Sequence, residues 1–270
     1  MPELPEVETT LRGIEPYLLK KKILNIQVRQ AQLRWPVPGT LAELKNQTVQ
    51  SLDRRGKYII ASTKTGSIII HLGMSGSLRI VDKPFDLRKH DHVIFELHEN
   101  RSMVYHDPRR FGTIIWTSEP AMQHSLLRKL GPEPLSDSFD GGLLFKLSRN
   151  KKVAVKNFIM NGHIVVGVGN IYANEALFRS GIRPGKAAGR VTGVQYNLLA
   201  QNIKKVLDAA IKSGGTTLRD FVNSKGEPGY FQQTLNVYGR EGEPCHQCGD
   251  AIKQRTIGQR STFYCANCQQ

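Results

Sequence analysis

The sequence lacks a long apolar run and a secretory leader. Its apolar runs stay well short of the roughly 20 residues that a membrane-spanning helix requires. The start, MPELPEVETT, is acidic and has neither the basic nor the apolar part of a signal peptide. The chain also has no internal repeat and no low-complexity tract. We therefore expect a soluble, intracellular protein with folded domains.

Cysteine is scarce, and its placement is informative. All four cysteines lie within the last 26 residues, as two C-x-x-C pairs with 16 residues between them: Cys245, Cys248, Cys265 and Cys268. This spacing is typical of four thiolates that hold one zinc ion. A redox dithiol or a set of reduced surface thiols is the alternative, but neither pair follows a βαβ unit. We predict one structural Zn²⁺ and, because strand-forming residues separate the pairs, a zinc-bound β-hairpin.

Acidic residues are outnumbered throughout the chain. It carries 38 Lys and Arg against 23 Asp and Glu, a net charge of +15 with a pI near 9.8. Residues 1–130 carry 20 basic and 13 acidic side chains (+7), and residues 131–270 carry 18 and 10 (+8). Such an excess indicates the kind of partner rather than the fold. A membrane surface would attract the same charge, but nucleic acid that touches both halves is the better prediction.

Hydrophobic spacing predicts a helix followed by strands. Val7, Leu11, Ile14 and Leu18 recur at helical spacing. From about residue 22 to 117 the pattern changes to short strands separated by turn signals. The expected strands are KILNIQVR, KYIIAST, SIIIHLGM, SLRIV, HVIFELHE and MVYHD. In HVIFELHE apolar and polar residues alternate, which predicts a half-buried strand. We expect a β-sandwich or barrel with a helix at its start.

The second half of the chain has a different pattern. Residues 131–142 are rich in Pro, Gly and acidic residues and predict a linker. Beyond it, helical periodicity predicts a helix over about 171–179 and a longer one through 199–210, which Gly214 and Gly215 can end. Residues 216–231 are polar and glycine-rich, which is typical of a mobile loop.

Six motifs stand in a recognisable order. They are MPELPEVE at the start, RRGKY at 54–58, HLGMSG at 71–76, DPRRFG at 107–112, VVGVGNIYANE at 165–175, and the terminal cysteine pairs. Together they resemble the formamidopyrimidine-DNA glycosylase family over essentially the whole chain. Its relative endonuclease VIII shares the proline start and the zinc hairpin, but Leu4 and DPRRFG resemble the purine-specific branch.

The resemblance implies an α+β fold in four parts. These are an N-terminal β-sandwich catalytic domain with an N-terminal helix (1–130), the linker (131–142), a helical domain with a helix-two-turns-helix motif (143–235) and a zinc finger (236–270). It also implies a monomer in the bacterial cytoplasm, associated with the nucleoid through DNA.

The resemblance further implies a bifunctional enzyme of base excision repair that acts on damaged double-stranded DNA. It would excise 8-oxoguanine and formamidopyrimidines and cut the strand by β,δ-elimination. The nucleophile would be the amine of Pro2 after removal of Met1. An α-amine, with a pKa of about 7.7 to 8.0, is more readily unprotonated than a lysine. By the same resemblance Glu3 moves a proton during base loss, Lys57 supplies one in β-elimination, and Arg260 assists δ-elimination.

Further residues match the DNA-binding set of the family. Because a base inside a duplex must be extruded before it can react, Met74 and Phe111 would fill the gap and Arg109 would bond the orphaned cytosine. Other contacts would come from Asn170 at a helix start and from His90, Lys151 and Tyr238. The loop 216–230 matches the lesion-capping loop. Glu6 matches a position near the deoxyribose, although helix-dipole stabilisation explains it equally well.

Each of these residues has an ordinary interpretation when it is taken alone. Glu3, Lys57 and Arg260 would be surface charges, and Met74 and Phe111 would be core residues. Two other functions also remain open: an endonuclease VIII-like glycosylase that prefers oxidised pyrimidines, and a non-catalytic zinc DNA-binding protein. Charge and zinc pairs do not separate an enzyme from a binding protein, whereas a proline start beside Glu3 favours the enzyme.

Overall fold

The computed structural model describes residues 2–215 and 235–270. The described residues form two compact units, one of residues 2–129 with 213–215 and one of residues 130–212 with 235–270. Within these ranges no helix is long and apolar enough to cross a membrane. The predicted loop at 216–230 lies outside the described residues.

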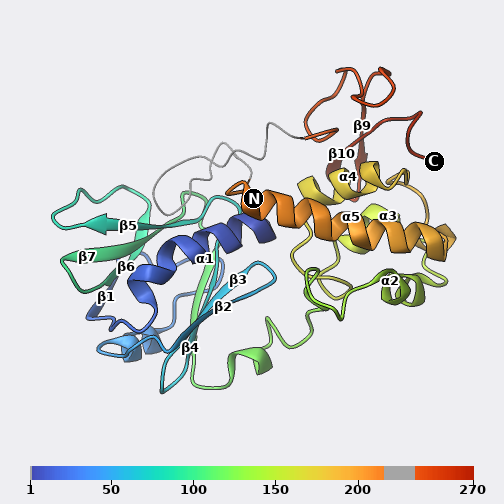
Figure 1. Ribbon diagram of the computed structural model, residues 1–270. Helices are drawn as coiled ribbons and strands as arrows, with labels where there is room; N and C mark the ends of the chain where they lie inside the picture. Colours follow the sequence, from blue (N-terminus) through green and yellow to red (C-terminus); the bar gives the residue numbers. More distant parts are fainter. Residues whose placement is uncertain (1, 216–234) are drawn as a thin grey trace. The chain divides into compact units, whose positions relative to one another are not determined.

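The first unit begins with helix α1 (Leu4–Leu18; Figure 1). The Glu6 carboxylate accepts a hydrogen bond from the backbone N–H of Glu3 at 2.8 Å, as part of a capping box at the helix start. The predicted apolar stripe is confirmed, because Val7, Leu11, Ile14 and Leu18 are all buried. The capping box and the buried stripe therefore fix the start of α1 and, with it, the position of the residues that precede the helix.

Two antiparallel four-stranded sheets follow, which confirms the predicted sandwich (Figure 1). The first has the order β1 (Asn25–Val28), β6 (Asp91–Glu96), β7 (Arg101–His106) and β5 (Ser77–Asp82). The second has the order β2 (Ser51–Arg55), β3 (Tyr58–Ser62), β4 (Ser67–His71) and β8 (Thr113–Thr117). Short 3-10 helices, Gly39–Leu44 and Ala121–Gln123, lie in the connections. Each of the six predicted strands overlaps one of these, whereas β2 and β8 were not predicted.

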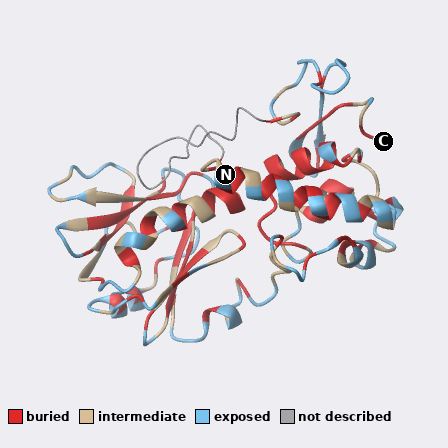
Figure 2. Cartoon of the chain, viewed as in Figure 1, coloured by how far each residue is buried: buried red, intermediate tan, exposed pale blue. Residues whose placement is uncertain are grey.

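Helix α1 packs against β2 and β3 of one sheet and β5 of the other. Strands β2 and β5 are edge strands, so the helix covers an edge of each sheet. Both sheets contribute buried aliphatic and aromatic side chains to one core with α1, and the interior strand segments are coloured as buried in Figure 2.

One strand differs from its predicted pattern. The alternation in HVIFELHE predicted a half-buried β6, but Asp91 to Phe95 are all buried. His92 is only 5% exposed because its ring bonds the Asp107 carbonyl and its own carbonyl accepts from Arg29 N–H. Polar partners therefore cover the face that the pattern assigned to solvent.

The second unit is helical and ends in a hairpin. Residues 130–140 form neither helix nor strand. The helices are α2 (Gly141–Ser148), α3 (Val155–Ile159), α4 (Asn170–Arg179) and α5 (Gly193–Lys212), with a 3-10 turn at Ala188–Arg190. Helices α4 and α5 confirm the two predicted helices, and α5 packs against α2 and α4. The sequence patterns did not identify α2 and α3.

The hairpin pairs β9 (Lys253–Ile257) with β10 (Arg260–Tyr264). Gly258 and Gln259 between them both have positive φ, 58° and 61°, as a two-residue type I′ turn requires. A Cβ at Gly258 would also meet the Asn157 side chain at 2.3 Å. The glycine thus lets the turn pack closely against α3.

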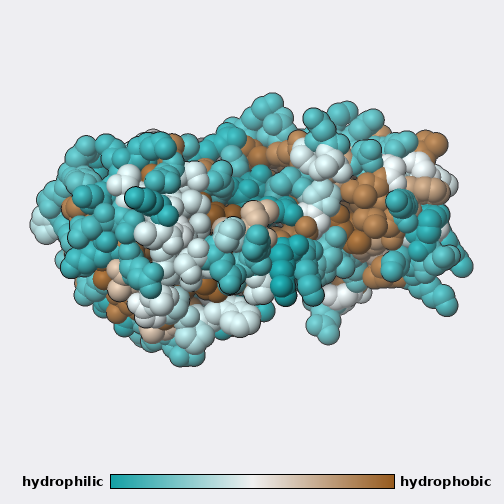
Figure 3. All heavy atoms as spheres, turned by 90° about the horizontal axis from the view of Figure 1, so that it is seen from below, coloured by the Kyte–Doolittle hydropathy of each residue, from teal (hydrophilic) through white to brown (hydrophobic). Residues whose placement is uncertain are grey.

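The surface agrees with the composition. Hydrophilic side chains cover most of the face drawn in Figure 3, and an apolar area lies on the helical unit. Exposed apolar residues of that unit include Phe145 on α2 and Val194 and Leu198 on α5. None of these three residues is among those that the sequence assigned to a site.

Candidate functional site

The beginning of the chain is held in a buried acidic setting. Pro2 is buried, and Glu3 and Glu6 are 2% and 0% exposed. Thr10 donates its hydroxyl to the Glu6 carbonyl at 2.8 Å, and a Cβ at Gly215 would lie 3.3 Å from Glu6 Oε1. The backbone at Gly215 therefore passes beside Glu6. Two carboxylic side chains are fixed next to the position from which a freed amine would act.

Lys57 lies in the tight turn between β2 and β3, where Gly56 has a φ of 57°. The Arg54 guanidinium donates from Nε to Glu8 Oε2 on α1 at 2.7 Å and from Nη1 to the Gly56 carbonyl at 3.1 Å. The turn is thereby tied to the helix that carries the chain start. Burial raises the pKa of Glu8, but the hydrogen bonds from Arg54 and Arg12 outweigh it, so the net pKa is lowered.

His71 lies close to this turn and is held neutral. Its ring stacks at an angle on Tyr58, with centroids 4.7 Å apart. Burial, followed by the positive charges of Lys57 and Arg34, lowers the pKa of His71 to about 4. The neutral ring accepts the Gly73 N–H at Nδ1, 3.0 Å away. At neutral pH this hydrogen bond fixes the turn that leads to Met74.

Met74, Arg109 and Phe111 are brought together by two neighbouring turns. Met74 and Phe111 are 37% and 42% exposed and Arg109 is exposed, so the core interpretation of these two apolar residues is wrong. The Arg109 guanidinium lies 4.9 Å from the centre of the Phe111 ring. A Cβ at Gly73 would be 2.4 Å from the Phe111 carbonyl carbon, which shows how closely the two turns pack.

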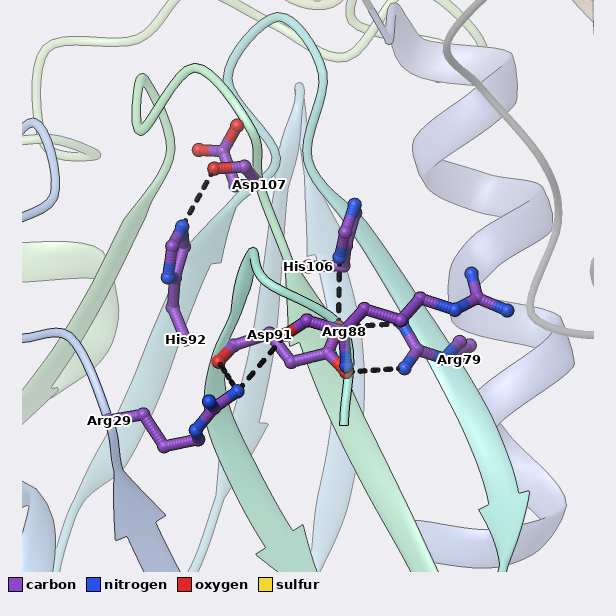
Figure 4. Close-up of polar contacts among 7 residues, drawn as sticks. All are labelled: Arg29, Arg79, Arg88, Asp91, His92, His106 and Asp107. Atoms are coloured by element: carbon purple, nitrogen blue, oxygen red, sulfur yellow. Dashed lines mark hydrogen bonds and ion pairs between the residues drawn. The ribbon is translucent and has the colours of Figure 1, made fainter. Parts of the chain in front are cut away.

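His90 directly precedes Asp91, whose contacts with Arg79, Arg88 and His106 are drawn in Figure 4. The Asp91 carboxylate accepts both Arg79 Nη groups, at 2.8 and 2.6 Å, and bonds His106 Nδ1 at 2.8 Å. It also accepts the Arg88 backbone N–H at 2.9 Å. The His90 ring lies 5.9 Å from that of His106. Arg88, Lys89 and His90 thus form a basic turn on a rigid carboxylate anchor.

In the second unit, the hairpin that carries Arg260 is fixed to the helices. The buried Lys156 Nζ donates to the Ser261 carbonyl at 3.0 Å and to Thr262 Oγ1 at 2.7 Å. Asn170 Nδ2 donates to the same Ser261 carbonyl at 3.0 Å. The structure therefore brings Asn170 and Arg260 together through Ser261, and it leaves Arg260 exposed at the first position of β10.

Tyr238 is positioned by a buried carboxylate. Glu175 of α4, 1% exposed, accepts the backbone N–H groups of Asn236, Val237 and Tyr238 at 2.9 to 3.0 Å. The Tyr238 ring contacts Phe263 of the hairpin edge to face at 5.1 Å. Lys151, the remaining predicted DNA contact, is exposed just after α2.

The four cysteines form one metal site, as predicted. Their sulfur atoms all lie within 4.8 Å of one another, with Cys245 to Cys268 at 3.9 Å and Cys248 to Cys265 at 3.4 Å. A tetrahedron of sulfurs at the usual Zn–S distance has edges of about 3.8 Å. The site fits a structural Zn²⁺ with four thiolate ligands.

Sequence reasoning did not identify several residues that hold the site. They are Glu8, Arg54, Asp91, Asp107, Lys156 and Glu175. Four of them, Glu8, Arg54, Asp107 and Glu175, stand inside the quoted motifs MPELPEVE, RRGKY, DPRRFG and VVGVGNIYANE, which was the available signal. The others depend on contacts between distant parts of the chain.

Comparisons with known proteins agree over the whole chain. The formamidopyrimidine-DNA glycosylase N-terminal domain matches residues 1–114, the H2TH domain of the same enzyme matches 130–222, and the zinc finger found in FPG and IleRS matches 242–270. The formamidopyrimidine-DNA glycosylase of Methylococcus capsulatus is 53% identical over 270 residues, with both chains covered completely.

Two solved structures are also similar. The Lactococcus lactis Fpg mutant G226P in complex with Fapy-dG containing DNA is 33% identical, with a TM-score of 0.92 and complete coverage of both chains. MutM in complex with carbocyclic 8-oxo-G containing DNA is 33% identical, with a TM-score of 0.91 and the same coverage. On these matches, the chain belongs to the formamidopyrimidine-DNA glycosylase family.

Proposed function

We propose that this protein removes oxidised purines, namely 8-oxoguanine and formamidopyrimidines, from duplex DNA and then cuts the strand. One observation supports this function above all: Pro2, the second residue of the chain, is buried and is followed by the buried carboxylates Glu3 and Glu6. Similar proteins were solved with DNA that contains Fapy-dG and carbocyclic 8-oxo-G, which supports the purine substrate class.

Removal of Met1 frees the secondary amine of Pro2 before the reaction begins. The nitrogen attacks C1′ of the damaged nucleotide, the bond from C1′ to the base breaks, and the base leaves with a proton supplied through Glu3. Opening of the sugar gives an iminium between Pro2 and C1′. This cation withdraws electrons, so loss of a C2′ proton breaks the bond from C3′ to its phosphate oxygen, and a second elimination breaks the one at C5′.

Two basic residues assist the eliminations. Lys57 contacts a phosphate and supplies a proton during β-elimination, and the Arg54 bonds to Glu8 and Gly56 keep its turn in place. Arg260 holds phosphate and assists δ-elimination, on a hairpin stabilised by zinc and by Lys156. Bound zinc supplies folding energy to the hairpin and takes no part in bond cleavage.

Further residues extrude the base and grip the duplex. Met74 and Phe111 fill the space left by the lesion, as apolar wedges do between base steps. Arg109 donates hydrogen bonds to the cytosine opposite. The phosphate contacts come from His90, Lys151, Asn170 and Tyr238. A protein with this substrate works where the chromosome is, which in bacteria is the cytoplasm, and we propose that it works as a monomer.

A trapping experiment tests the nucleophile. Mature protein and borohydride are mixed with a duplex that carries 8-oxoguanine opposite cytosine, and the covalent complex is digested with trypsin. We expect the DNA remnant on the peptide from residue 2 to Arg12, PELPEVETTLR. Protein with an uncleaved extra residue before Pro2 is the matched control and gives no trapped complex.

The same assay separates the alternatives. A remnant on a lysine peptide would refute Pro2 as nucleophile, and absence of trapping by the mature protein would indicate a zinc DNA-binding protein. Faster release from duplexes with oxidised pyrimidines than from those with 8-oxoguanine would indicate the endonuclease VIII-like specificity.

A further inference from the structure

Asp107, at the end of β7, has a fully buried carboxylate with three neutral donors. Ser75 Oγ donates to Oδ1 at 2.8 Å, and the Gly112 N–H and the Tyr105 hydroxyl donate to Oδ2 at 2.8 and 3.1 Å. Burial, with the nearby charge of Asp107, raises the pKa of Tyr105 well above its usual value, so this hydroxyl stays protonated and donates. A buried carboxylate is expensive unless its lone pairs are satisfied, so this arrangement is specific.

Two of the three donors, Ser75 and Gly112, come from the turns that carry Met74, Arg109 and Phe111, and the third, Tyr105, lies on β7. Ser75 follows Met74, and Gly112 follows Phe111. The Ser75 hydroxyl also accepts the Arg109 N–H at 3.3 Å, so Ser75 joins the second turn directly as well as through the carboxylate. The Asp107 side chain thus links the turn that carries Met74 to the turn that carries Arg109 and Phe111.

The backbone of Asp107 anchors this link to the sheet. Its N–H donates to the His90 carbonyl at 3.0 Å, and its carbonyl bonds His92 Nε2 at 2.8 Å (Figure 4). The Arg110 N–H donates back to the same carbonyl at 3.2 Å. The residue is fixed on one side to β6 and its preceding turn, and on the other it holds the DPRRFG turn.

The glycines of both turns show why the link is tight. A Cβ at Gly112 would fall 1.7 Å from the Tyr105 hydroxyl oxygen, and one at Gly76 would fall 2.2 Å from the Leu72 carbonyl oxygen. No larger residue leaves room for the hydroxyl groups that reach Asp107. The two glycines therefore leave the space in which this hydrogen-bond network forms beside the core residues Leu72 and Tyr105.

We propose that Asp107 is a positioning residue that holds Met74, Arg109 and Phe111 as one preformed wedge for insertion into the duplex. The proposal rests on the proposed function, because it assumes that these side chains replace the extruded base. Insertion unstacks base pairs at a cost of a few kcal/mol, and a wedge that is already ordered loses less conformational freedom on binding. A loose pair of turns would have to be ordered at each insertion.

Ser75→Ala is the first test because it cuts the link between the turns while the two donors to Asp107 Oδ2 remain. We expect single-turnover release of 8-oxoguanine from duplex DNA to fall about tenfold, the factor that one lost hydrogen bond supplies. Fluorescence of a 2-aminopurine next to the lesion should report a smaller amplitude of insertion. Borohydride trapping on duplex with an abasic site, at saturating protein, should stay within about twofold of the unmodified protein.

A double-mutant cycle distinguishes positioning from simple destabilisation. In a Phe111→Ala background the Ser75→Ala change should cost less than about twofold, because the wedge is already lost, whereas independent structural effects would multiply. Asp107→Asn should behave like Ser75→Ala with a larger loss, since the amide places a donor where an acceptor is needed. Ser77→Ala, a buried serine on β5, is the matched control and should leave release unchanged.

Normal release by Ser75→Ala and Asp107→Asn, or a cycle in which the Ser75 and Phe111 effects multiply, would overturn the positioning role. The failure of the proposed function gives a different result. In that case the unmodified protein would neither release 8-oxoguanine nor form a trapped complex, and the wedge proposal would fall with it.

Discussion

The Arg54 guanidinium joins helix α1 to the Lys57 turn by binding the Glu8 carboxylate, with Nε and Oε2 2.7 Å apart. Both side chains are mostly buried, 11% and 18% exposed. Since Arg54 also holds the Gly56 carbonyl at 3.1 Å, the pair fixes the turn that carries Lys57 to α1.

Glu8→Gln should therefore weaken strand cleavage more than DNA binding. We expect a several-fold lower rate of cleavage at a preformed abasic site and about 1 kcal/mol lower unfolding free energy at pH 7. Because the folded pKa of Glu8 is lowered, this stability is present above its usual pKa of 4.5 and is lost as the pH falls. Glu15→Gln, on the same helix, is the control. Equal cleavage rates for the two variants would contradict the role of the pair.

Asp91 should contribute to stability over a defined pH range. Burial would raise its pKa, but bonds from Arg79, Arg88 N–H and His106 lower it from 3.8 to about 2. The depressed folded pKa corresponds to about 2 kcal/mol that is present at pH 7 and lost as the pH falls from about 4 to 2. Urea unfolding of Asp91→Asn should show this deficit at pH 7, with the exposed Asp86→Asn as control. A deficit that stays constant down to pH 2 would refute the assignment.

Gly73→Ala should be strongly destabilising. Gly73 has a φ of 66°, and its new Cβ would lie 2.4 to 2.6 Å from the backbone of Phe111 and Gly112. The left-handed conformation alone costs an alanine about 1 to 2 kcal/mol, so we expect a loss of at least about 2 kcal/mol in thermal or urea unfolding. Gly39→Ala, where nothing lies within 4 Å of the new Cβ, should change stability little. Similar losses at both positions would show that the close approach of the turns is not the cause.

Loss of zinc should disable the hairpin and with it the Arg260 contact. Cys248→Ser, or chelation of the unmodified protein, should lower DNA affinity at least about tenfold in a fluorescence-anisotropy titration, because structural zinc supplies folding energy. His246→Ala keeps all four thiolates and should bind one zinc per chain and DNA normally. Metal analysis verifies that the zinc has been lost. Full DNA affinity of the zinc-free protein would disprove this dependence.

The interface should depend strongly on salt. If five phosphates are neutralised, the logarithm of the DNA association constant should fall with the logarithm of salt concentration at a slope of about −4 to −5. Lys151→Ala should make this slope shallower by about one, while Lys64→Ala, an exposed lysine of the β3–β4 turn, serves as control. A nearly flat slope for the unmodified protein would exclude a phosphate-dominated interface.

Local sequence was sufficient where a pattern repeats within a few residues. The stripe of Val7, Leu11, Ile14 and Leu18 predicted α1, and the cysteine spacing predicted the zinc site. In both cases the interacting groups are neighbours along one element or one hairpin. The motif order was sufficient for the family because each motif carries side chains of a specific type at fixed spacing.

Other elements gave too weak a signal. Helix α3 has five residues, too few for a helical period to show. Strand β2 reads SLDRR and is partly exposed at a sheet edge, so its composition is that of a surface segment. The alternation in β6 was misleading because hydrogen-bond partners from Asp107 and Arg29 cover its polar face.

The amino-acid sequence by itself determined the zinc ligands, the amphipathic first helix, the basic charge and the motifs that place the chain in its family, since these depend on residues close together along the chain. Only the tertiary structure decided which residues hold the functional ones in place. The Glu8–Arg54 pair spans 46 positions, the Ser75–Asp107 bond 32 and the Lys156–Thr262 bond 106. Contacts at such separations arise when the strands and helices pack, and no local pattern encodes them.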